Sequence, residues 1–523
     1  FLMNSASDTL AGYDETSAEA NAGKFYCTNW LADSTKKSLL ADIGIGTIDQ
    51  LLLSILPVRY QDLRLYGMKI MVLVVDEVHA YDPYMNKLLC AVLKAHIAAG
   101  GSAVLLSATI PQVLKRKLVD SYYEGLGEDY WYDQKVDNFP LLTKADKDNG
   151  LQEIPVKSFQ KKRHVTIEFL YEEERIYKKI TNSIKENICI SWIRNTVYDV
   201  LEAYEKLTCE YGVSEENIIV FHSRFAYADR SRIEEKVIRL FGKNSKQNER
   251  AGKVVIATQV IEQSLDLDFD VMVSDLAPVE LIIQRAGRLQ RHDHGDRCKP
   301  VMYIYSPPET DNPEAEWYQN VFPKASGVYR NTAILWRTKE ILKKEEAIVL
   351  PQKARLLIES VYGDDPIQSP ECFSENEIDA LGETMAKEDT ADFSKLSLEN
   401  GYCRESAINE WDEEEKITTR LSDEQCTVYI CFFDAERIKP LYVGEFPWEM
   451  SSLKIRKGKI KKMNYQGEIN KAIEQKKAER NFRQDDIFLI ADRNSNSNEI
   501  VKMEFENLYI SYSNIKGLQV EKK

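Results

Sequence analysis

Short apolar runs alternate with stretches of helical spacing in the first part of the chain. Residues 68–77 (MKIMVLVVDE) are almost continuously apolar and end in two acids, which is typical of a strand buried on both faces of a parallel sheet. Residues 83–100 follow with helical spacing, and Pro83 suits the first turn of that helix. Residues 102–109 (SAVLLSAT) are the next predicted strand. This alternation predicts an α/β fold with a parallel sheet.

A second block with the same alternation runs from about residue 164 to residue 310. Its predicted strands are 164–170, 188–193, 217–223, 253–259 and 270–275. Helical patterns lie between them, so this block also favours a parallel, doubly wound sheet.

The remaining segments differ in pattern. Residues 363–416 are rich in acids and serines, which is typical of a solvated or mobile linker, whereas 427–433 and 486–492 are predicted strands. We therefore predict five segments along the chain: a first α/β lobe (1–118), a connector (119–163), a second α/β lobe (164–310), a helical and acidic linker (311–416) and a small C-terminal α+β domain (417–523).

Composition limits the classes of function. The chain has 523 residues, enough for three or four domains, and a net charge of −15, so any contact with nucleic acid must use a local patch or groove. Its nine cysteines include no CxxC pair, which indicates reduced thiols in a cytoplasmic protein and no zinc site. No apolar run approaches the ~18 residues that span a bilayer, and we expect no membrane partner.

The sequence DEVH (76–79) ends the first predicted strand. Ligands bind at the carboxyl ends of strands in open parallel sheets. A carboxylate there can hold Mg²⁺ between two phosphates, and a second can position or deprotonate the attacking water. We assign Asp76 to Mg²⁺, Glu77 to the water and His79 to coupling with the neighbouring lobe. The alternative is that both acids only cap the next helix.

Two further motifs belong to this block. Ser107 and Thr109, at the end of the next strand, can relay the state of a bound nucleotide to the sheet or to the neighbouring lobe. Thr47 begins the helical run TIDQLLLSIL, where its hydroxyl and the helix amides can bind a backbone phosphate of nucleic acid. An ordinary Thr N-cap explains Thr47 equally well.

In the second block, Ser223 and Arg224 lie at the end of one strand, and Thr258 and Gln259 lie at the end of another. Loops at strand ends meet ligands in this fold class, so we expect these four residues to contact a nucleic-acid strand.

The segment QRAGRLQR (284–291) predicts a helix whose Arg288 and Arg291 share one face. Two guanidiniums on one face can grip a γ-phosphate across a cleft, and such arginine fingers are worth about 10³–10⁵ in rate. We assign Gln284, Arg288 and Arg291 to the nucleotide, with Asp266 reaching the ribose or these arginines. The alternative is a salt-bridged surface helix.

In order and spacing, DEVH, SAT, ATQ…E…D and QRAGR…R resemble motifs II, III, V and VI of superfamily 2 helicases. Five longer stretches are similar to the CRISPR-associated helicase-nucleases of type I systems: GIGTIDQLLL (44–53), VVDEVHAYDPYM (74–85), FHSRF (221–225), ATQVIEQSLDLDFDVMVSDLAP (257–278) and QRAGRLQRH (284–292). The similarity covers roughly residues 36–300 and is weaker in the C-terminal domain.

This resemblance implies tandem RecA-like lobes, the first truncated at its N-terminus. It implies an ATP-dependent, Mg²⁺-dependent motor that moves 3′ to 5′ along single-stranded DNA. It further implies recruitment by an RNA-guided CRISPR surveillance complex and a metal-dependent HD nuclease domain before the motor.

Two parts of that family pattern are missing. No GxxxxGK[ST] phosphate loop occurs, and AGKFY, FGKNS and AGKVV lack the Ser or Thr directly after the lysine. Because this loop supplies the main ligands of the β- and γ-phosphates, we expect no measurable ATP hydrolysis by this chain alone. The nuclease cluster is also missing, and we do not expect His292 and Asp293 to bind metal.

The chain begins at Phe1, so we expect a partial reading frame, a processed product or an excised piece, with the phosphate loop and nuclease on a companion chain or a missing N-terminal half. A basic segment near the C-terminus can bind DNA phosphates or the surveillance complex, or can be a solvated loop: Lys454, Arg456, Lys457, Lys459, Lys461 and Lys462.

Two other functions stay open. One is a general superfamily 2 helicase, against which HAYDPYM and SLDLDFD argue. The other is a non-enzymatic nucleic-acid-binding or scaffold protein derived from such a motor, against which the intact DEVH and arginine motifs argue.

Overall fold

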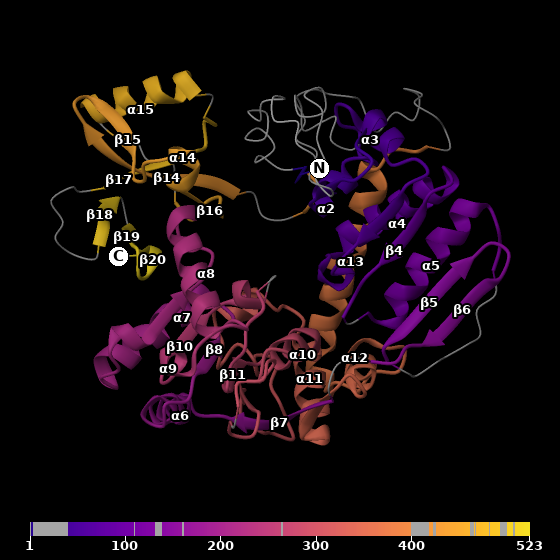
Figure 1. Ribbon diagram of the computed structural model, residues 1–523, viewed down its shortest axis with the longest axis horizontal. Coiled ribbons are helices and arrows are strands. Elements are labelled where there is room, and N and C mark those ends of the chain that lie inside the picture. The colour runs from indigo at the N-terminus through magenta and orange to yellow at the C-terminus, as the bar shows by residue number, and fades with distance from the viewer. Residues whose placement is uncertain are drawn as a thin grey trace, which may run out of the picture. The chain divides into compact units, whose positions relative to one another are not determined.

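The computed structural model forms two compact units (Figure 1). The first comprises residues 1–160, 354–366 and 375–421, and the second 161–353, 367–374 and 422–523. The structure describes residues 2–3, 40–108, 110–130, 139–158, 162–262, 265–295, 297–398, 418–421, 425–460, 465, 467–480, 482–491, 499–505 and 508–522. The predictions for Thr109, Lys461 and Lys462 lie outside these residues.

The centre of the first unit is a two-stranded parallel sheet. Strand β3 (Val72–Val75) pairs with β4 (Ser102–Leu105), with Val72 opposite Ser102 and Val75 opposite Leu105. Helix α4 (Pro83–Ala98) connects them, and the Asp82 side chain caps it by accepting from the Met85 amide at 2.9 Å. Both strands and the connecting helix are confirmed.

The prediction that the first strand is buried on both faces is wrong for this chain. Val72 and Val74 are 66% and 60% exposed, whereas Val75 is buried in a core with the apolar face of α4. Helices α4 and α5 (Gln112–Leu126) pack side by side in this unit (Figure 1). Residues within a strand point alternately to opposite faces, so the face that carries Val72 and Val74 is left open.

Other elements complete the first unit. The predicted connector contains an antiparallel hairpin of β5 (Leu141–Asp146) and β6 (Gly150–Pro155). Part of the predicted acidic linker forms a helix of 21 residues, α13, whose Ala391 is buried in the same core as α4. The remaining elements are α2 (Ile48–Leu52), α3 (Gln61–Gly67), α12 (Ala354–Tyr362), α13 (Ser374–Ser394) and the parallel pair β1 (Leu2–Met3) and β2 (Ile45–Gly46).

The second unit contains a seven-stranded sheet of order β13-β7-β12-β11-β8-β10-β9. All neighbours are parallel except β13, which runs antiparallel to β7 at the edge. The strands are β7 (Arg163–Leu170), β8 (Ile190–Ile193), β9 (Ile218–Phe221), β10 (Val254–Ala257), β11 (Val271–Asp275), β12 (Val301–Tyr305) and β13 (Ala347–Leu350). The helices between them are α6 (Glu173–Lys185), α7 (Val197–Glu205), α8 (Tyr227–Phe241), α9 (Gln247–Arg250), α10 (Val279–Ala286) and α11 (Thr332–Glu345).

This sheet confirms the α/β prediction, because β8 to β11 are buried along their whole length, as a parallel sheet covered by helices requires. The five predicted strands correspond to β7 to β11. Strands β12 and β13 were not predicted.

The C-terminal residues form two smaller sheets in the same unit. The long strand β14 pairs with β15 and β16 antiparallel and with β17 parallel, and β18-β19-β20 is an antiparallel meander. The elements are β14 (Gln425–Asp434), β15 (Arg437–Pro440), α14 (Pro447–Met450), β16 (Ser452–Arg456), α15 (Gly467–Arg480), β17 (Ile487–Ile490), β18 (Glu499–Phe505), β19 (Leu508–Ser513) and β20 (Gly517–Lys522). The two predicted C-terminal strands are β14 and β17.

Candidate functional site

Asp76 and Glu77 lie directly after β3 and are both exposed. Glu77 adopts a left-handed backbone (φ 54°), and its amide donates to Asp76 Oδ1 at 2.8 Å. Neither carboxylate caps α4, since Asp82 does so, and Glu77 makes no side-chain capping bond to the 3₁₀ turn that it precedes. Two accessible carboxylates therefore sit at the carboxyl end of a parallel strand.

His79 connects this pair to the end of β4. Its Nε2 lies 3.3 Å from Glu77 Oε2, and its Nδ1 lies 3.0 Å from Ser107 Oγ. Burial lowers the pKa of His79, and the nearby charges of Glu77 and Asp76 oppose that shift only in part. The hydrogen bond between Nδ1 and the Ser107 hydroxyl can form with a neutral ring, because either group can be the donor. One hydrogen bond and one close contact thus connect Ser107, His79 and the Glu77 carboxylate.

A groove of about 650 Å³ brings Asp76 together with Thr47. Thr47 is the N-cap residue of α2, but its side chain makes no capping bond. Tyr81 also lines the groove and donates from its hydroxyl to the carbonyl of Asp76 at 2.8 Å. Thr47 therefore takes the N-cap position without a side-chain capping bond, and it lines the same groove as Asp76.

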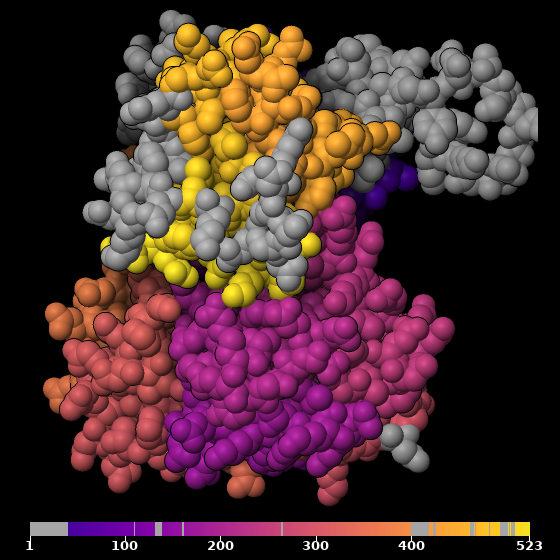
Figure 2. Space-filling view, turned by 90° about the vertical axis from the view of Figure 1, so that its left-hand side faces the viewer, coloured from indigo at the N-terminus to yellow at the C-terminus, as the bar shows by residue number. Residues whose placement is uncertain are grey.

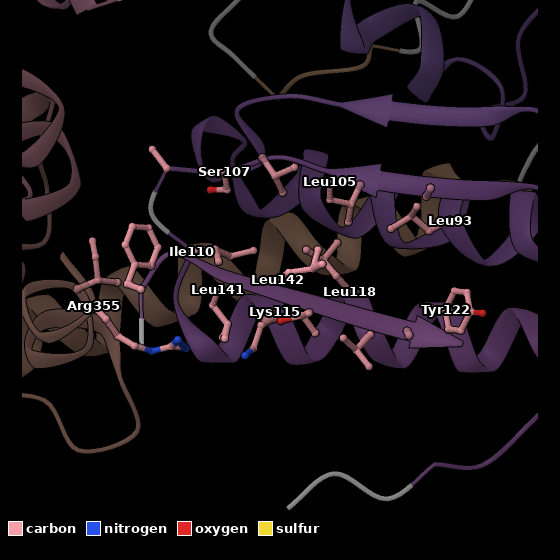
Figure 3. A pocket seen from close by; sticks show the side chains of 18 of the residues that line it. Leu93, Leu105, Ser107, Ile110, Lys115, Leu118, Tyr122, Leu141, Leu142 and Arg355 are labelled. Atoms are coloured by element: carbon pink, nitrogen blue, oxygen red, sulfur yellow. The ribbon is translucent and has the colours of Figure 1, made fainter. Parts of the chain in front are cut away.

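A second hollow, a cavity of about 270 Å³, lies behind Ser107 (Figure 3). Leu105 of β4, Leu118 of α5 and Leu141 of β5 point into it, and Lys115 lies at its lining with its ammonium paired to Glu153. Because the lining is mostly apolar and this ammonium is already paired, the cavity accommodates apolar groups rather than phosphates.

In the second unit, the prediction that Arg288 and Arg291 share a helix face is wrong. Helix α10 ends at Ala286, and both arginines follow it in a turn and a loop. Arg288 is buried, and its guanidinium donates to the carbonyls of Leu265 and Glu262. Arg291 is 40% exposed, so it is the more accessible of the two.

Asp266 does reach the predicted arginine. Its Oδ1 lies 2.9 Å from Arg291 Nε and 3.0 Å from His292 Nε2. Gln284 lies half-buried on α10, in the helix that leads to this loop.

The next acid, Asp268, shapes that loop and was not predicted. Its carboxylate accepts from the amides of Arg291 and His292, both at 3.1 Å, and from Arg297 at 2.9 Å. Arg250, which is fully buried, lies 4.0 Å from the same carboxylate and donates to the Asp268 carbonyl at 2.6 Å. The SLDLDFD stretch could have indicated this role of Asp268, because an acid within an apolar run needs a buried partner.

The predicted nucleic-acid residues lie at adjacent strand ends. Strands β9 and β10 are parallel neighbours, and the Thr258 amide donates to the Phe221 carbonyl at 3.1 Å. Ser223 is exposed and Arg224 is buried. Gln259 donates from its amide nitrogen to Tyr329 Oη at 2.9 Å. The sheet thus brings Ser223, Arg224, Thr258 and Gln259 to one edge.

Sequence reasoning also missed a long-range ion pair in the first unit. Arg420, at the start of the predicted C-terminal domain, donates from Nε and Nη2 to the two carboxylate oxygens of Asp49, each at 2.9 Å. The residues are 371 positions apart, so no local pattern indicates the pair.

Among the described residues, no three His, Cys, Asp or Glu side chains gather as a metal site. In the same part of the chain, every helix is too short or too polar to cross a membrane.

The chain is similar to one family of known proteins. Residues 186–294 match the family model "CRISPR-associated nuclease/helicase Cas3, C-terminal". The CRISPR-associated endonuclease/helicase Cas3 of Escherichia coli K12 is 33% identical over 429 residues, which are 79% of this chain and 44% of that protein.

Two solved structures resemble the whole chain. T. fusca Cas3 with AMPPNP is 25% identical, with a TM-score of 0.79 over 99% of this chain and 61% of that one. A chain of a CRISPR RNA-guided surveillance complex in a pre-nicking state shares the fold, with 24% identity and a TM-score of 0.71 over 92% of this chain and 61% of that one. The chain therefore spans about half the length of the relatives that it matches.

Proposed function

We propose, because this chain belongs to the CRISPR-associated nuclease/helicase Cas3 family, that it is the motor portion of an ATP-dependent helicase that moves along single-stranded DNA. One observation carries the proposal: at the carboxyl ends of β3 and β4, His79 is hydrogen-bonded to Ser107 and lies 3.3 Å from the Glu77 carboxylate. This connection joins a water-positioning carboxylate to the neighbouring strand, as a nucleotide-driven motor needs.

The exposed carboxylates fit Mg²⁺ and a water. Mg²⁺ prefers carboxylate oxygens and keeps several waters, so Asp76 suffices as the protein ligand beside the phosphates. Glu77 then orients or deprotonates the attacking water. Bound ATP supplies the γ-phosphate, and a structure of T. fusca Cas3 with AMPPNP supports nucleotide binding in the family.

The second unit contributes the arginines. Arg291 is the better candidate for the finger, because its guanidinium is partly exposed and Asp266 holds it in place. Arg288 donates to the backbone carbonyls of Glu262 and Leu265. That Asp76 and Glu77 face Arg288 and Arg291 across a shared cleft remains a prediction.

The proposed partners are single-stranded DNA and an RNA-guided surveillance complex. A protein of the same fold has been solved in a CRISPR RNA-guided surveillance complex. The chain has no GxxxxGK[ST] loop, so we propose that a companion polypeptide or N-terminal half supplies it.

ATP hydrolysis stimulated by single-stranded DNA tests this function. We expect no turnover by the purified chain alone, and turnover after co-expression with the polypeptide encoded directly upstream. Glu77→Gln should lower the restored rate at least about 100-fold, because the water loses its base. Glu124→Gln, at an exposed acid of α5, is the matched control and should leave the rate unchanged.

Robust turnover by the chain alone that Glu77→Gln abolishes would overturn the dependence on a companion. DNA binding without turnover in every combination would favour the second candidate, a non-enzymatic binding protein, which the missing phosphate loop supports.

A further inference from the structure

The C-terminal meander is seated on the second lobe at the FHSRF segment. The amide of Leu518 donates to the Arg224 carbonyl at 2.8 Å, and the hydroxyl of Tyr198 donates to the Val520 carbonyl at 3.2 Å. Figure 2 shows this contact as the meeting of the yellow C-terminal residues with the magenta lobe. Residues from widely separated parts of the chain therefore share one surface around Tyr198.

Three cationic side chains converge on the Tyr198 ring. Arg224 Cζ lies 4.7 Å from the ring centroid, Lys324 Nζ lies 4.9 Å away and Lys459 Nζ lies 5.7 Å away. They come from the end of β9, from the segment before α11 and from the turn after β16. Only the tertiary fold brings them together.

These charges are not balanced by acids. Arg224, Lys324 and Lys459 form no ion pair with any residue that the structure describes, and the buried Arg224 Nη1 has no hydrogen-bond partner there. Nearby cations differ, since Lys516 pairs with Glu205 at 2.9 Å. In a chain of net charge −15, three cations around one ring that form no ion pair with the described residues are a local concentration of positive charge, which attracts anions.

The lowered pKa of Lys459 is consistent with such a concentration of positive charge. Burial, and then the charges of Arg224 and Arg456, lower its pKa to about 8. A bound anion would relieve this repulsion. Lys324 and Lys459 are exposed as whole residues, although the Lys459 ammonium is partly withdrawn from water, whereas Arg224 is buried.

We propose that Lys324, Lys459 and Arg224, arranged around Tyr198, bind a backbone phosphate of single-stranded DNA. The inference rests on the proposed function and adds to it a contact made jointly by the second lobe and the C-terminal domain. Its position favours a nucleic-acid strand, because Ser223 adjoins Arg224 and the β10 end with Thr258 is the neighbouring strand end. Phosphates are spaced regularly along single-stranded DNA, so one DNA strand can contact both the cations around Tyr198 and the residues at the ends of β9 and β10.

Fluorescence anisotropy of a labelled oligothymidine strand, titrated at several salt concentrations, tests the inference with the full chain. Lys324→Ala and Lys459→Ala change exposed side chains, so neither should prevent folding. Each should weaken binding about threefold or more at low salt and reduce the slope of log affinity against log salt by about 0.7. Lys471→Ala, at an exposed lysine of α15 outside the basic segment, is the control and should bind like the unmodified chain.

The outcomes separate the inference from the function on which it rests. If the unmodified chain binds the strand and both variants keep its affinity and salt slope, the inference alone is overturned. An equal loss in Lys471→Ala would also overturn it, because a diffuse charge effect would then explain the data. A chain that does not bind oligothymidine at all overturns both the inference and the proposed function.

Discussion

At the scale of single residues, the buried His222 of the second lobe is held in its neutral form by its hydrogen-bond partners. His222 is fully buried, donates from Nε2 to the Lys516 carbonyl at 3.1 Å and accepts at Nδ1 from the Arg224 amide at 3.1 Å. This pattern requires the neutral ring. Burial, and then the charge of Arg224, lower the pKa of His222 to about 3.

Stability should therefore depend on pH through His222. Between the native pKa of about 3 and the ordinary value of 6.5, the unfolded chain binds a proton that the native state excludes. The free energy of unfolding should fall as pH drops below 6.5, by about 1.4 kcal/mol per pH unit from this group. Urea unfolding at pH 7.5 and 5.5 measures this change in the free energy of unfolding. The change should be smaller in His222→Gln, which lacks the titrating ring. Identical pH dependence in both proteins would contradict the assignment.

At the scale of elements, the turn that joins β19 to β20 fixes the meander on the lobe. Gly517 has φ +67°, and a Cβ there would lie 2.5 Å from the Arg224 carbonyl oxygen and 2.8 Å from His222 Cε1. Backbone is in close contact with backbone at this point, so only glycine fits.

Gly517→Ala should accordingly destabilise the chain by about 1–3 kcal/mol, through strain and displacement of the meander. Gly212→Ala is a matched control, because Gly212 has φ +64° and no atom within 4 Å of a Cβ. Urea unfolding should give a clearly larger loss for position 517. Equal losses would mean that the contact with Arg224 and His222 is unimportant.

The predicted elements show what a sequence pattern can and cannot supply. Strands β8 to β11 could be predicted because their residues are buried throughout and read as apolar runs. The hairpin β5–β6 alternates exposed and half-buried positions in a polar segment, so it read as a connector. The helix expected across 284–291 stops at Ala286, because the loop with Arg291 is held by Asp268, a long-range contact.

In the candidate site, too, residues in local motifs could be predicted from the sequence, whereas long-range contacts could not. DEVH and the arginine motif were found from local order and spacing. The Arg420–Asp49 pair and the cations around Tyr198 join residues far apart in the chain, which local patterns do not encode. The basic segment was noted, but its partners Arg224 and Lys324 were not.

At the scale of the whole molecule, the uncovered face of the β3–β4 sheet is the main departure from a closed fold. Parallel sheets normally have both faces covered, yet Val72 and Val74 are exposed here. We expect the companion that supplies the phosphate loop to cover this face.

Val74→Lys should separate folding from assembly. The side chain is already exposed, so the unfolding free energy of the chain alone should change by less than about 0.5 kcal/mol. The ATP hydrolysis restored by the companion should fall sharply, since a lysine would be buried without a partner. Val328→Lys, at an exposed valine of the second unit, is the control. Undiminished restored activity in Val74→Lys would rule out this docking face.

The same uncovered valines affect how the chain behaves when it is produced without its companion. Among the described residues, β3 pairs only with β4, so one backbone edge of β3 is open beside an apolar surface that also includes Ile70, Val104 and Leu106. Open strand edges next to apolar surface promote sticking between copies. Produced by itself, the polypeptide should associate with itself as its concentration rises, and synthesis together with its companion should keep it dispersed.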